Sequence, residues 1–276
     1  MIAAGAPFWK MSGSGNDFVF FDARNGLDLT AWPPERIQAI CAAHTGVGAD
    51  GIVLLTTDAS LPLRIIYFNR DGSRGELCGN ASLCTVRLAA ELGIPFDGGE
   101  LRFGTDSGTV TGRLRPDDGR PEIDLGSISG VDLTSPAITR HPEEAQLGFA
   151  SVGVPHLVVV VPDAETAELP VRGPELRYHL SLTAGANVNF VSRRPEGWRI
   201  RTWERGVEAE TLACGTGCCA SAALLAAWGL APGEGTILQV ESGRTVRVRL
   251  RSTPDGIAPS LSGEGRVVYT GQLAEL

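Results

Sequence analysis

Two cysteines stand where a pair of thiols could carry out acid–base chemistry. Cys78 and Cys214 are each followed by glycine, a small polar residue and an apolar, alanine-rich run, and they lie 136 residues apart in a chain of 276. A thiol at the start of a helix has a lowered pKa, because the helix dipole and the free N–H groups favour the thiolate. A thiolate that removes a proton from one side of a carbon, with a thiol that returns one from the other side, inverts a stereocentre. The pair therefore predicts a racemase or epimerase.

The same helix starts could hold the group next to the reacting carbon. Free N–H groups at a helix N-terminus bind anions such as a carboxylate. Gly79, Gly215 and Gly217 would let a ligand approach the backbone closely. Fixed N–H donors on an α-carboxylate would also stabilise the charge that develops when the α-proton leaves. These features favour a small amino-acid substrate.

The chain repeats itself, which indicates that the two cysteines belong to equivalent halves. Four segments recur in the same order, and their first residues are offset by 135 to 139 positions: Asn16–Ala23 with Pro155–Ala164, Gly48–Val53 with Gly185–Phe190, Ile65–Arg70 with Ile200–Arg205, and Leu101–Val110 with Leu238–Val246. The repeat predicts two pseudo-symmetric domains. We expect the first to span 1–118, with 264–276 returning to it, and the second to span 119–263. The stretch Pro116–Pro121 is the expected linker.

Hydrophobic patterns predict a helix directly after each of the two cysteines. Residues 18–22, 64–69, 157–161 and 199–203 are rich in β-branched and aromatic side chains and predict strands. Helices are expected at Pro33–Ala43, Asn80–Leu92 and Thr216–Trp228, the last two ended by Gly93 and Gly229. Because the last two are apolar on most faces, both should be buried. The expected fold class is α/β of the α+β type, in which each domain wraps a curved, mostly antiparallel sheet around a central helix.

Composition excludes several other classes of protein. The net charge of −8 disfavours nucleic-acid binding. No apolar run reaches the length of a membrane span, and the first ten residues do not form a secretory signal, so we expect a cytoplasmic protein without membrane contacts. In that compartment the six cysteines are expected to be reduced.

Alternative uses of the cysteines remain open. Cys41, Cys84, Cys218 and Cys219 are interpreted as small buried hydrophobes. A zinc site is disfavoured, because the chain has no Cys-x-x-Cys or histidine ligand pair, and no metal is predicted. A disulfide between Cys78 and Cys214 would be an inactivated state. A non-catalytic scaffold protein is also disfavoured, since it would be expected to lack one of these two cysteines.

Several motifs resemble the diaminopimelate epimerase family across nearly the whole chain. They are Gly13–Phe18, Gly46–Gly51, Phe68–Ser73, Cys78–Asn80, Asn187–Phe190, Glu204–Gly206 and Glu210–Gly217. The resemblance implies two α/β halves, each a curved sheet around a central helix, with the ligand between them. It implies interconversion of LL- and meso-diaminopimelate, an intermediate of lysine and peptidoglycan synthesis, without a pyridoxal or other cofactor. It also implies a homodimer.

The resemblance assigns roles to individual residues. Cys78 and Cys214 match the two bases, and His156 and Glu204 are expected to act beside them in catalysis. The amides after each cysteine are expected to hold the reacting carboxylate: Gly79, Asn80, Gly215 and Thr216. The remaining positions that match substrate contacts are Asn16, Asn69, Asn187, Glu204 and Arg205. Asp50 is interpreted as structural.

The chain departs from the family pattern near the distal end of the substrate. Val154 replaces an asparagine that normally holds the unreacting end, and Ala81 and Leu83 replace a glycine and an arginine. The pair Glu208-Ala209 replaces a single glycine. Because these changes leave both cysteines in place, they favour an alternative substrate for the same chemistry. The alternative function is a racemase of another amino acid, such as histidine, lysine or ornithine.

Overall fold

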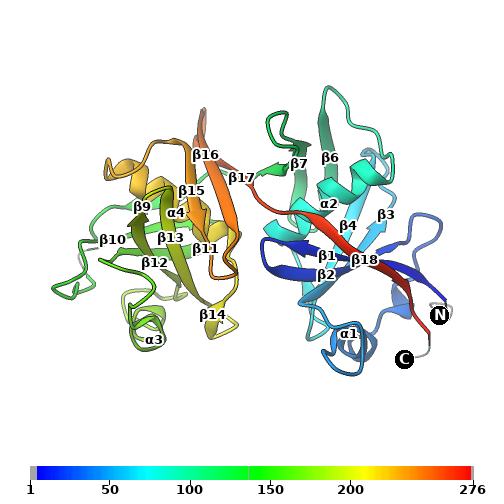
Figure 1. Cartoon of the computed structure of the whole chain (residues 1–276), viewed down its shortest axis with the longest axis horizontal. Helices are drawn as coiled ribbons and strands as arrows, with labels where there is room; N and C mark the ends of the chain where they lie inside the picture. The colour runs from blue at the N-terminus through cyan, green and yellow to red at the C-terminus, as the bar shows by residue number, and fades with distance from the viewer. Residues whose placement is uncertain (1–4, 136, 275–276) are drawn as a thin grey trace. The chain divides into compact units, whose positions relative to one another are not determined.

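A computed structural model describes residues 5–135 and 137–274 of the chain. The chain divides into two compact units, Met1–Ile123 with Gly263–Leu276, and Asp124–Ser262. None of the described helices has the length and apolar character needed to cross a bilayer. Figure 1 labels most of the helices and strands of each unit.

The first unit is a mostly antiparallel sheet with two α-helices. Its strands are β1 (Pro7–Gly13), β2 (Asn16–Asp22), β3 (Gly51–Thr56), β4 (Leu63–Asn69), β5 (Arg74–Gly75), β6 (Glu100–Thr105), β7 (Gly108–Leu114), β8 (Pro121–Asp124, which ends at the unit boundary) and β18 (Arg266–Gln272). Its helices are the short 3-10 helix η1 (Leu29–Ala31), α1 (Pro34–Cys41) and α2 (Gly79–Glu91). The strands pair in the order β18-β1-β2-β3-β4-β6-β7-β8, with β5 on β4, and only β2/β3 and β4/β6 are parallel.

The second unit repeats this topology strand for strand. Its strands are β9 (Ser129–Asp132), β10 (Gln146–Val152), β11 (Val154–Val160), β12 (Asn187–Arg194), β13 (Gly197–Glu204), β14 (Ala209–Thr211), β15 (Glu234–Gln239), β16 (Thr245–Thr253) and β17 (Gly256–Ser262), and its helices are α3 (Leu169–Arg177) and α4 (Gly215–Ala227). They pair in the order β9-β10-β11-β12-β13-β15-β16-β17, with β14 on β13 and β11/β12 and β13/β15 parallel. The predicted pseudo-symmetric fold is confirmed.

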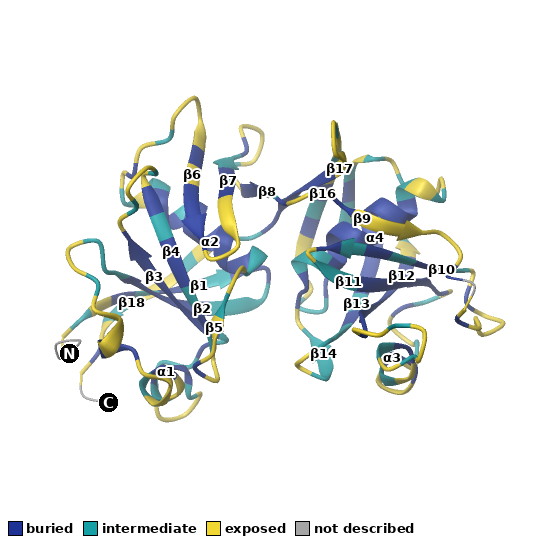
Figure 2. Ribbon diagram, turned by 180° about the vertical axis from the view of Figure 1, so that it is seen from behind, coloured by how far each residue is buried: buried dark blue, intermediate teal, exposed yellow. Residues whose placement is uncertain are grey.

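Each sheet is covered by a helix on both faces, so its central strands are apolar on both sides. In the first unit, Val19 and Ile52 pack with Ile37 of α1 in one core cluster. Their neighbours Phe18 and Val53 point to the opposite face, because successive side chains of a strand alternate. The second unit has the matching core between its sheet and α3. The central helices α2 and α4 are buried along most of their length, as Figure 2 shows.

Both central helices begin directly after a cysteine. Cys78 and Cys214 have extended backbones, with φ/ψ of −130/116° and −125/105°, and each is the N-cap of its helix. Gly93 and Gly229 directly follow the C-cap residues of the two helices, and their φ angles of +67° and +71° favour glycine. The helices predicted from the sequence are therefore confirmed to within a residue or two at each end.

Candidate functional site

Cys78 and Cys214 occupy the same position in the two units. Each precedes a glycine that opens the first turn of the buried helix of its own unit. The first N–H groups of a helix have no partner inside the helix, so the amides after each cysteine are available to an anion. The thiol of Cys214 lies 3.6 Å from the hydroxyl of Thr216. Cys214 is 8% exposed, whereas Cys78 is of intermediate exposure.

The other four cysteines are buried, as the sequence predicts. Burial raises the pKa of the Cys41 thiol to about 11. Burial likewise raises the pKa values of Cys84, Cys218 and Cys219 well above the ordinary value. A thiol with a raised pKa is a poor base and nucleophile at neutral pH. These four side chains therefore serve as apolar packing.

The first unit brings Asn16 to the start of α2. The Asn80 amide donates a hydrogen bond to Asn16 Oδ1 at 2.7 Å, and Asn16 Nδ2 donates to Asp50 Oδ2 at 2.9 Å. Asn80 is 4% exposed. Asp50 thus holds a predicted site residue in place, which agrees with its interpretation as structural. Two of the predicted substrate contacts, Asn16 and Asn80, lie together.

Asn69 is placed at the end of β4, at the turn that leads toward Cys78. Its amide donates to Ser73 Oγ at 3.0 Å, and its backbone N–H donates to Ser73 O at 2.8 Å. Asn69 also pairs across the sheet with Gly51, next to Asp50. Asn69 therefore both closes this turn and stands near the residues that position Asn16.

The second unit joins Asn187 to Arg205. Asn187 Oδ1 accepts a hydrogen bond from the backbone N–H of Arg205 at 2.7 Å, and the Asn187 amide donates to Pro155 O at 3.3 Å. The Arg205 guanidinium donates to Ala184 O at 3.0 Å. Asn187 is 4% exposed, so the amide fixes the backbone that carries Arg205.

Glu204 is the last residue of β13 and directly precedes Arg205. Its Oε2 accepts a hydrogen bond from the Thr211 hydroxyl at 2.9 Å. Thr211 belongs to β14, which pairs with β13 through Thr202 and Thr211. This contact orients the carboxylate toward the strand that immediately precedes the cysteine loop.

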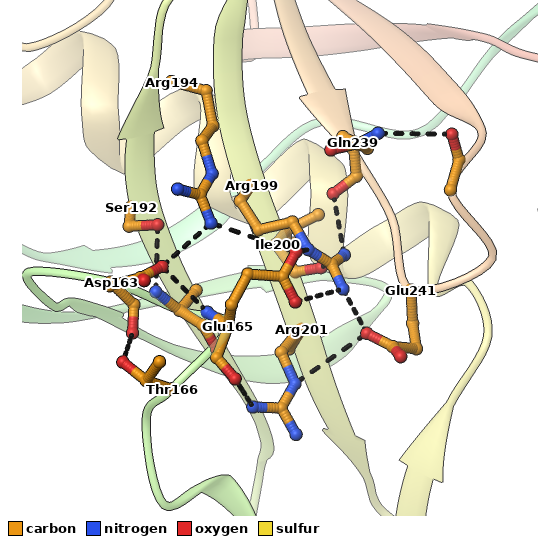
Figure 3. Close-up of polar contacts among 12 residues, drawn as sticks. Asp163, Glu165, Thr166, Ser192, Arg194, Arg199, Ile200, Arg201, Gln239 and Glu241 are labelled. Atoms are coloured by element: carbon orange, nitrogen blue, oxygen red, sulfur yellow. Dashed lines mark hydrogen bonds and ion pairs between the residues drawn. The ribbon is translucent and has the colours of Figure 1, made fainter.

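An ion-pair network fixes the β13–β14 hairpin. The guanidinium of Arg201 donates to both carboxylate oxygens of Glu210, at 2.6 Å each. Arg199, 4% exposed, forms ion pairs with Glu165 and Glu241 (Figure 3). The paired charges brace β13 and β14 on both sides of Glu204 and Arg205.

His156 is completely buried on β11. The Asn189 amide lies 3.2 Å from His156 Nδ1, and His156 Nε2 is buried without a hydrogen bond to any residue in the described part of the chain. Burial, together with the positive charge of Arg205, lowers the pKa of His156 to about 3. The imidazole is therefore neutral at physiological pH.

The positions that depart from the family pattern lie in the second unit or in α2. Val154 is the first residue of β11, two residues before His156. Glu208 adopts a left-handed conformation with φ of +57° and forms an ion pair with Arg177 at 2.9 Å. Ala81 and Leu83 are fully buried in α2. The two-residue replacement thus forms a loop that is tied to the end of α3.

Sequence reasoning did not single out Asn189 or Thr202. Both are buried polar residues on central strands, and Thr202 Oγ1 donates to Asn189 Oδ1 at 2.9 Å. An asparagine within the apolar strand segment Val188–Val191 was the signal available.

A separate cavity of about 490 Å³ lies against α3, lined by Glu144, Arg172 and Phe190 among others. None of the residues predicted for the site lines it. Over residues 5–135 and 137–274, no three side chains of the types that bind metal ions come together.

Solved structures with the same architecture include several isomerases. A phenazine biosynthesis protein of the PhzF family from Bacillus anthracis matches 99% of this chain and 100% of its own, with a TM-score of 0.75 and 14% identity. A probable proline racemase from Agrobacterium radiobacter matches 98% of this chain and 93% of its own, with a TM-score of 0.68 and 18% identity. These likenesses define the fold class, a two-unit fold shared with epimerases and racemases.

Sequence comparison defines the family. The diaminopimelate epimerase profile matches residues 8–131 and 148–258. A diaminopimelate epimerase from Gemmatimonas aurantiaca is 46% identical over 280 residues, which cover 98% of this chain and 99% of the relative. Another from Aquifex aeolicus is 36% identical over 97% of this chain and 98% of its own. The chain belongs to the diaminopimelate epimerase family, and the resemblance inferred from its motifs is confirmed.

Proposed function

We propose that the protein interconverts LL- and meso-diaminopimelate by a two-base mechanism, with Cys78 and Cys214 as the bases. The observation that carries the proposal is the matched placement of these cysteines. Each is the N-cap of a buried helix, after the same succession of strands, in a chain that belongs to the diaminopimelate epimerase family. No other cysteine has this placement among the described residues.

The chemistry moves one proton off the α-carbon and another onto it. One cysteine, as thiolate, takes the α-proton and becomes a thiol, and the electron pair delocalises into the α-carboxylate. The amides of Gly79, Asn80, Gly215 and Thr216 stabilise that charge because they are fixed donors at helix starts. The other cysteine, as thiol, gives its proton to the opposite face and becomes thiolate. The reverse reaction exchanges the two roles.

The remaining predicted residues bind the other polar groups of the substrate. Arg205 offers a planar guanidinium to the distal carboxylate. Glu204, Asn16, Asn69 and Asn187 offer oxygen acceptors to ammonium groups. We propose that His156 contacts the reacting centre as a neutral donor and that Glu204 acts beside the cysteines in catalysis.

Isotope exchange tests the mechanism directly. In D2O, a two-base enzyme gives product that carries deuterium at the α-carbon, while the recovered substrate remains unlabelled at early times. This is expected because the proton donor has already exchanged with solvent. A product that keeps the substrate's own proton would contradict the two-base assignment.

Substitution of the cysteines tests which thiols act. Cys78→Ala and Cys214→Ala should each lower the rate of inversion by at least about a thousandfold, because each removes an obligatory proton carrier. Cys41→Ala, which removes a buried thiol of raised pKa, is the matched control and should keep near wild-type activity. Full activity in either of the first two variants would overturn the proposal.

Val154 favours a second candidate, a racemase of another amino acid. Its side chain cannot form the hydrogen bond that an asparagine would make to a polar distal group, and one such bond is worth about 1 kcal/mol. Deuterium uptake should therefore be screened over LL-diaminopimelate, histidine, lysine and ornithine. Uptake into one of the last three but not into diaminopimelate would select the second candidate.

The cellular setting follows from the same chemistry. We propose a cytoplasmic enzyme of lysine and peptidoglycan precursor synthesis, because a pair of working thiols requires a reducing compartment. We also propose a homodimer, which the family resemblance implies. Sedimentation of the purified protein at micromolar concentration tests this, and a monomer would contradict it.

A further inference from the structure

Three polar side chains lie on one face of the second unit's central strands. His156, Asn189 and Thr202 come from β11, β12 and β13 and are 0%, 0% and 4% exposed. Their strand neighbours Leu157 and Val188 pack on the opposite face, in the core with α3. The three polar groups therefore face α4, the helix that begins after Cys214.

Hydrogen bonds fix the orientation of the Asn189 amide. Its Nδ2 donates to Leu157 O at 2.9 Å, and a carbonyl oxygen can only accept. Its Oδ1 accepts from Thr202 Oγ1 at 2.9 Å. The second hydrogen of Nδ2 is then directed to His156 Nδ1, 3.2 Å away. The Nδ1 atom is the acceptor in this contact, so the neutral imidazole carries its proton on Nε2.

The Nε2–H group is a buried donor. It forms no hydrogen bond with residues 5–135 or 137–274. Leaving such a donor unsatisfied is unfavourable, and buried polar groups in native proteins nearly always have a partner. A partner that arrives with the substrate would satisfy it.

The first unit shows that the fold does not require polar residues here. In the sheet pairing, Val53 stands between Phe20 and Tyr67 as Asn189 stands between Val158 and Thr202. Phe18, two residues before Phe20, matches His156, two residues before Val158. The first unit thus has an apolar and aromatic set in which the rings of Phe18 and Tyr67 are 6.1 Å apart.

Gly217 lies close to both Asn189 of this polar set and Cys214. A methyl group on Gly217 would come within 2.3 Å of Asn189 Oδ1 and 3.3 Å of Cys214 Sγ. The first unit has Ala81 at the matching position, three residues after Cys78. The glycine thus leaves room for the Asn189 amide directly beside the start of α4.

We propose that Asn189 is a positioning residue that holds His156 as the Nε2–H tautomer, so that the imidazole donates a hydrogen bond to the substrate bound beside Cys214. The proposal rests on the proposed function for the identity of the substrate. It does not rest on it for the state of the imidazole.

The tautomer can be measured in the wild-type protein. With ¹⁵N-labelled histidine, two-bond ¹H–¹⁵N correlations distinguish the two neutral tautomers, and the chain has only four histidines. His156→Gln identifies the His156 signal by its disappearance. The expected result is the Nε2–H tautomer throughout pH 5 to 8. A proton on Nδ1 would overturn the proposal whether or not the protein acts on diaminopimelate.

Asn189→Asp tests the link between tautomer and catalysis. A carboxylate only accepts, so the His156 signal should change to a protonated Nδ1, and kcat should fall at least about 100-fold, as expected for a wrongly protonated histidine. Asn25→Asp, the same exchange at an exposed loop, is the control and should change neither the His156 tautomer nor kcat. A switched tautomer with wild-type kcat would overturn the proposal.

Thr202→Val provides a second variant if Asn189→Asp does not fold. It removes the donor to Asn189 Oδ1 but keeps the shape of the side chain. The amide loses one of its anchors, so we expect a mixture of tautomers and a kcat lowered more than threefold, with KM changed less. A mixture of tautomers with unchanged kcat would count against the proposal. A variant in which both the His156 tautomer and kcat stay as in the wild type would also count against it.

If the wild-type protein shows no exchange at diaminopimelate, the proposed function fails while the tautomer result stands. The kcat comparison is then made with the amino acid that does exchange.

Discussion

The amide of Asn80, in the first turn of α2, donates a hydrogen bond to Asn16 Oδ1 at 2.7 Å. Asn16 in turn donates to Asp50 Oδ2 at 2.9 Å, and Asp50 also accepts from the backbone N–H of Asp17 at 3.3 Å. An ionised carboxylate can only accept, so Asp50 determines which end of the Asn16 amide faces Asn80. The start of the cysteine helix is thereby tied to β2 and to the loop before β3.

Asp50→Asn should weaken the site without removing a substrate contact. The new amide can donate as well as accept, so the Asn16 amide is no longer held in one orientation. Loss of that hydrogen bond is worth about 1 kcal/mol, which predicts a kcat/KM about fivefold to tenfold lower. Steady-state kinetics measure this. Asp97→Asn, at an exposed turn, is the control, and equal kinetics in the two variants would contradict the role given to Asp50.

Much of the fold could be predicted because the sequence repeats and because the central helices are apolar on most faces. The segments around β2, β3, β4 and the β6–β7 hairpin recur in the second half with the same strand pairings. Helix α3 could not be located in this way. Pro170, Gly173 and Pro174 lie within its nine residues, and these types disfavour a helix interior. Tertiary packing of Leu169 and Leu176 outweighs that preference.

The sequence indicates candidate site residues only where the residue type itself suggests a chemical role. Cysteine followed by glycine at a helix start is such a signal, and both cysteines cap their helices. Asn189 gave no comparable signal, because its role depends on three strands that are adjacent in space and not in sequence. The contact of Asp50 with Asn16 could not be predicted either, because it joins residues 34 positions apart.

Gly217→Ala adds only one methyl group, yet we expect it to disturb the site strongly. The added methyl would lie 2.3 Å from Asn189 Oδ1, so either the amide or the first turn of α4 must shift. Overpacking of this kind costs about 1–3 kcal/mol of stability. Because Cys214 Sγ lies 3.3 Å from the same methyl, we expect kcat to fall at least about tenfold as well.

Gly233→Ala is the matched control for this change. It lies in the same unit, no heavy atom lies within 4 Å of the added methyl, and its backbone is not left-handed. Thermal unfolding and steady-state kinetics should be near wild type for this variant. A Gly217→Ala protein that is equally stable and active would show that the contact with Asn189 is not restrictive.

Arg199→Ala should destabilise the protein more than the loss of a surface ion pair. The Arg199 side chain is 4% exposed, and its partners Glu165 and Glu241 are 50% and 35% exposed. Water partly screens the two carboxylates after the change, so we expect a loss of about 2 kcal/mol, part of it from lost packing of the arginine stem. Urea unfolding measures the loss. Arg120→Ala, whose 4.0 Å pair with Asp118 is half exposed, should cost less than about 1 kcal/mol.

The buried imidazole of His156 should make the protein sensitive to acid. Burial, with the positive charge of Arg205, lowers the pKa of His156 to about 3, whereas an unfolded histidine titrates near 6.5. Between these values the unfolded chain binds a proton that the folded protein does not, so the free energy of unfolding contributed by this group falls as the pH falls below 6.5. The contribution of His156 to the slope of unfolding free energy against pH approaches about 1.4 kcal/mol per pH unit.

His156→Gln should remove this contribution. Urea unfolding at pH 6.5, 5.5 and 4.5 should then give a free energy of unfolding that depends less steeply on pH than in the wild-type protein. His44→Gln, at an exposed position, is the control and should keep the wild-type slope, while an unchanged slope in His156→Gln would mean that His156 takes up a proton in the folded protein.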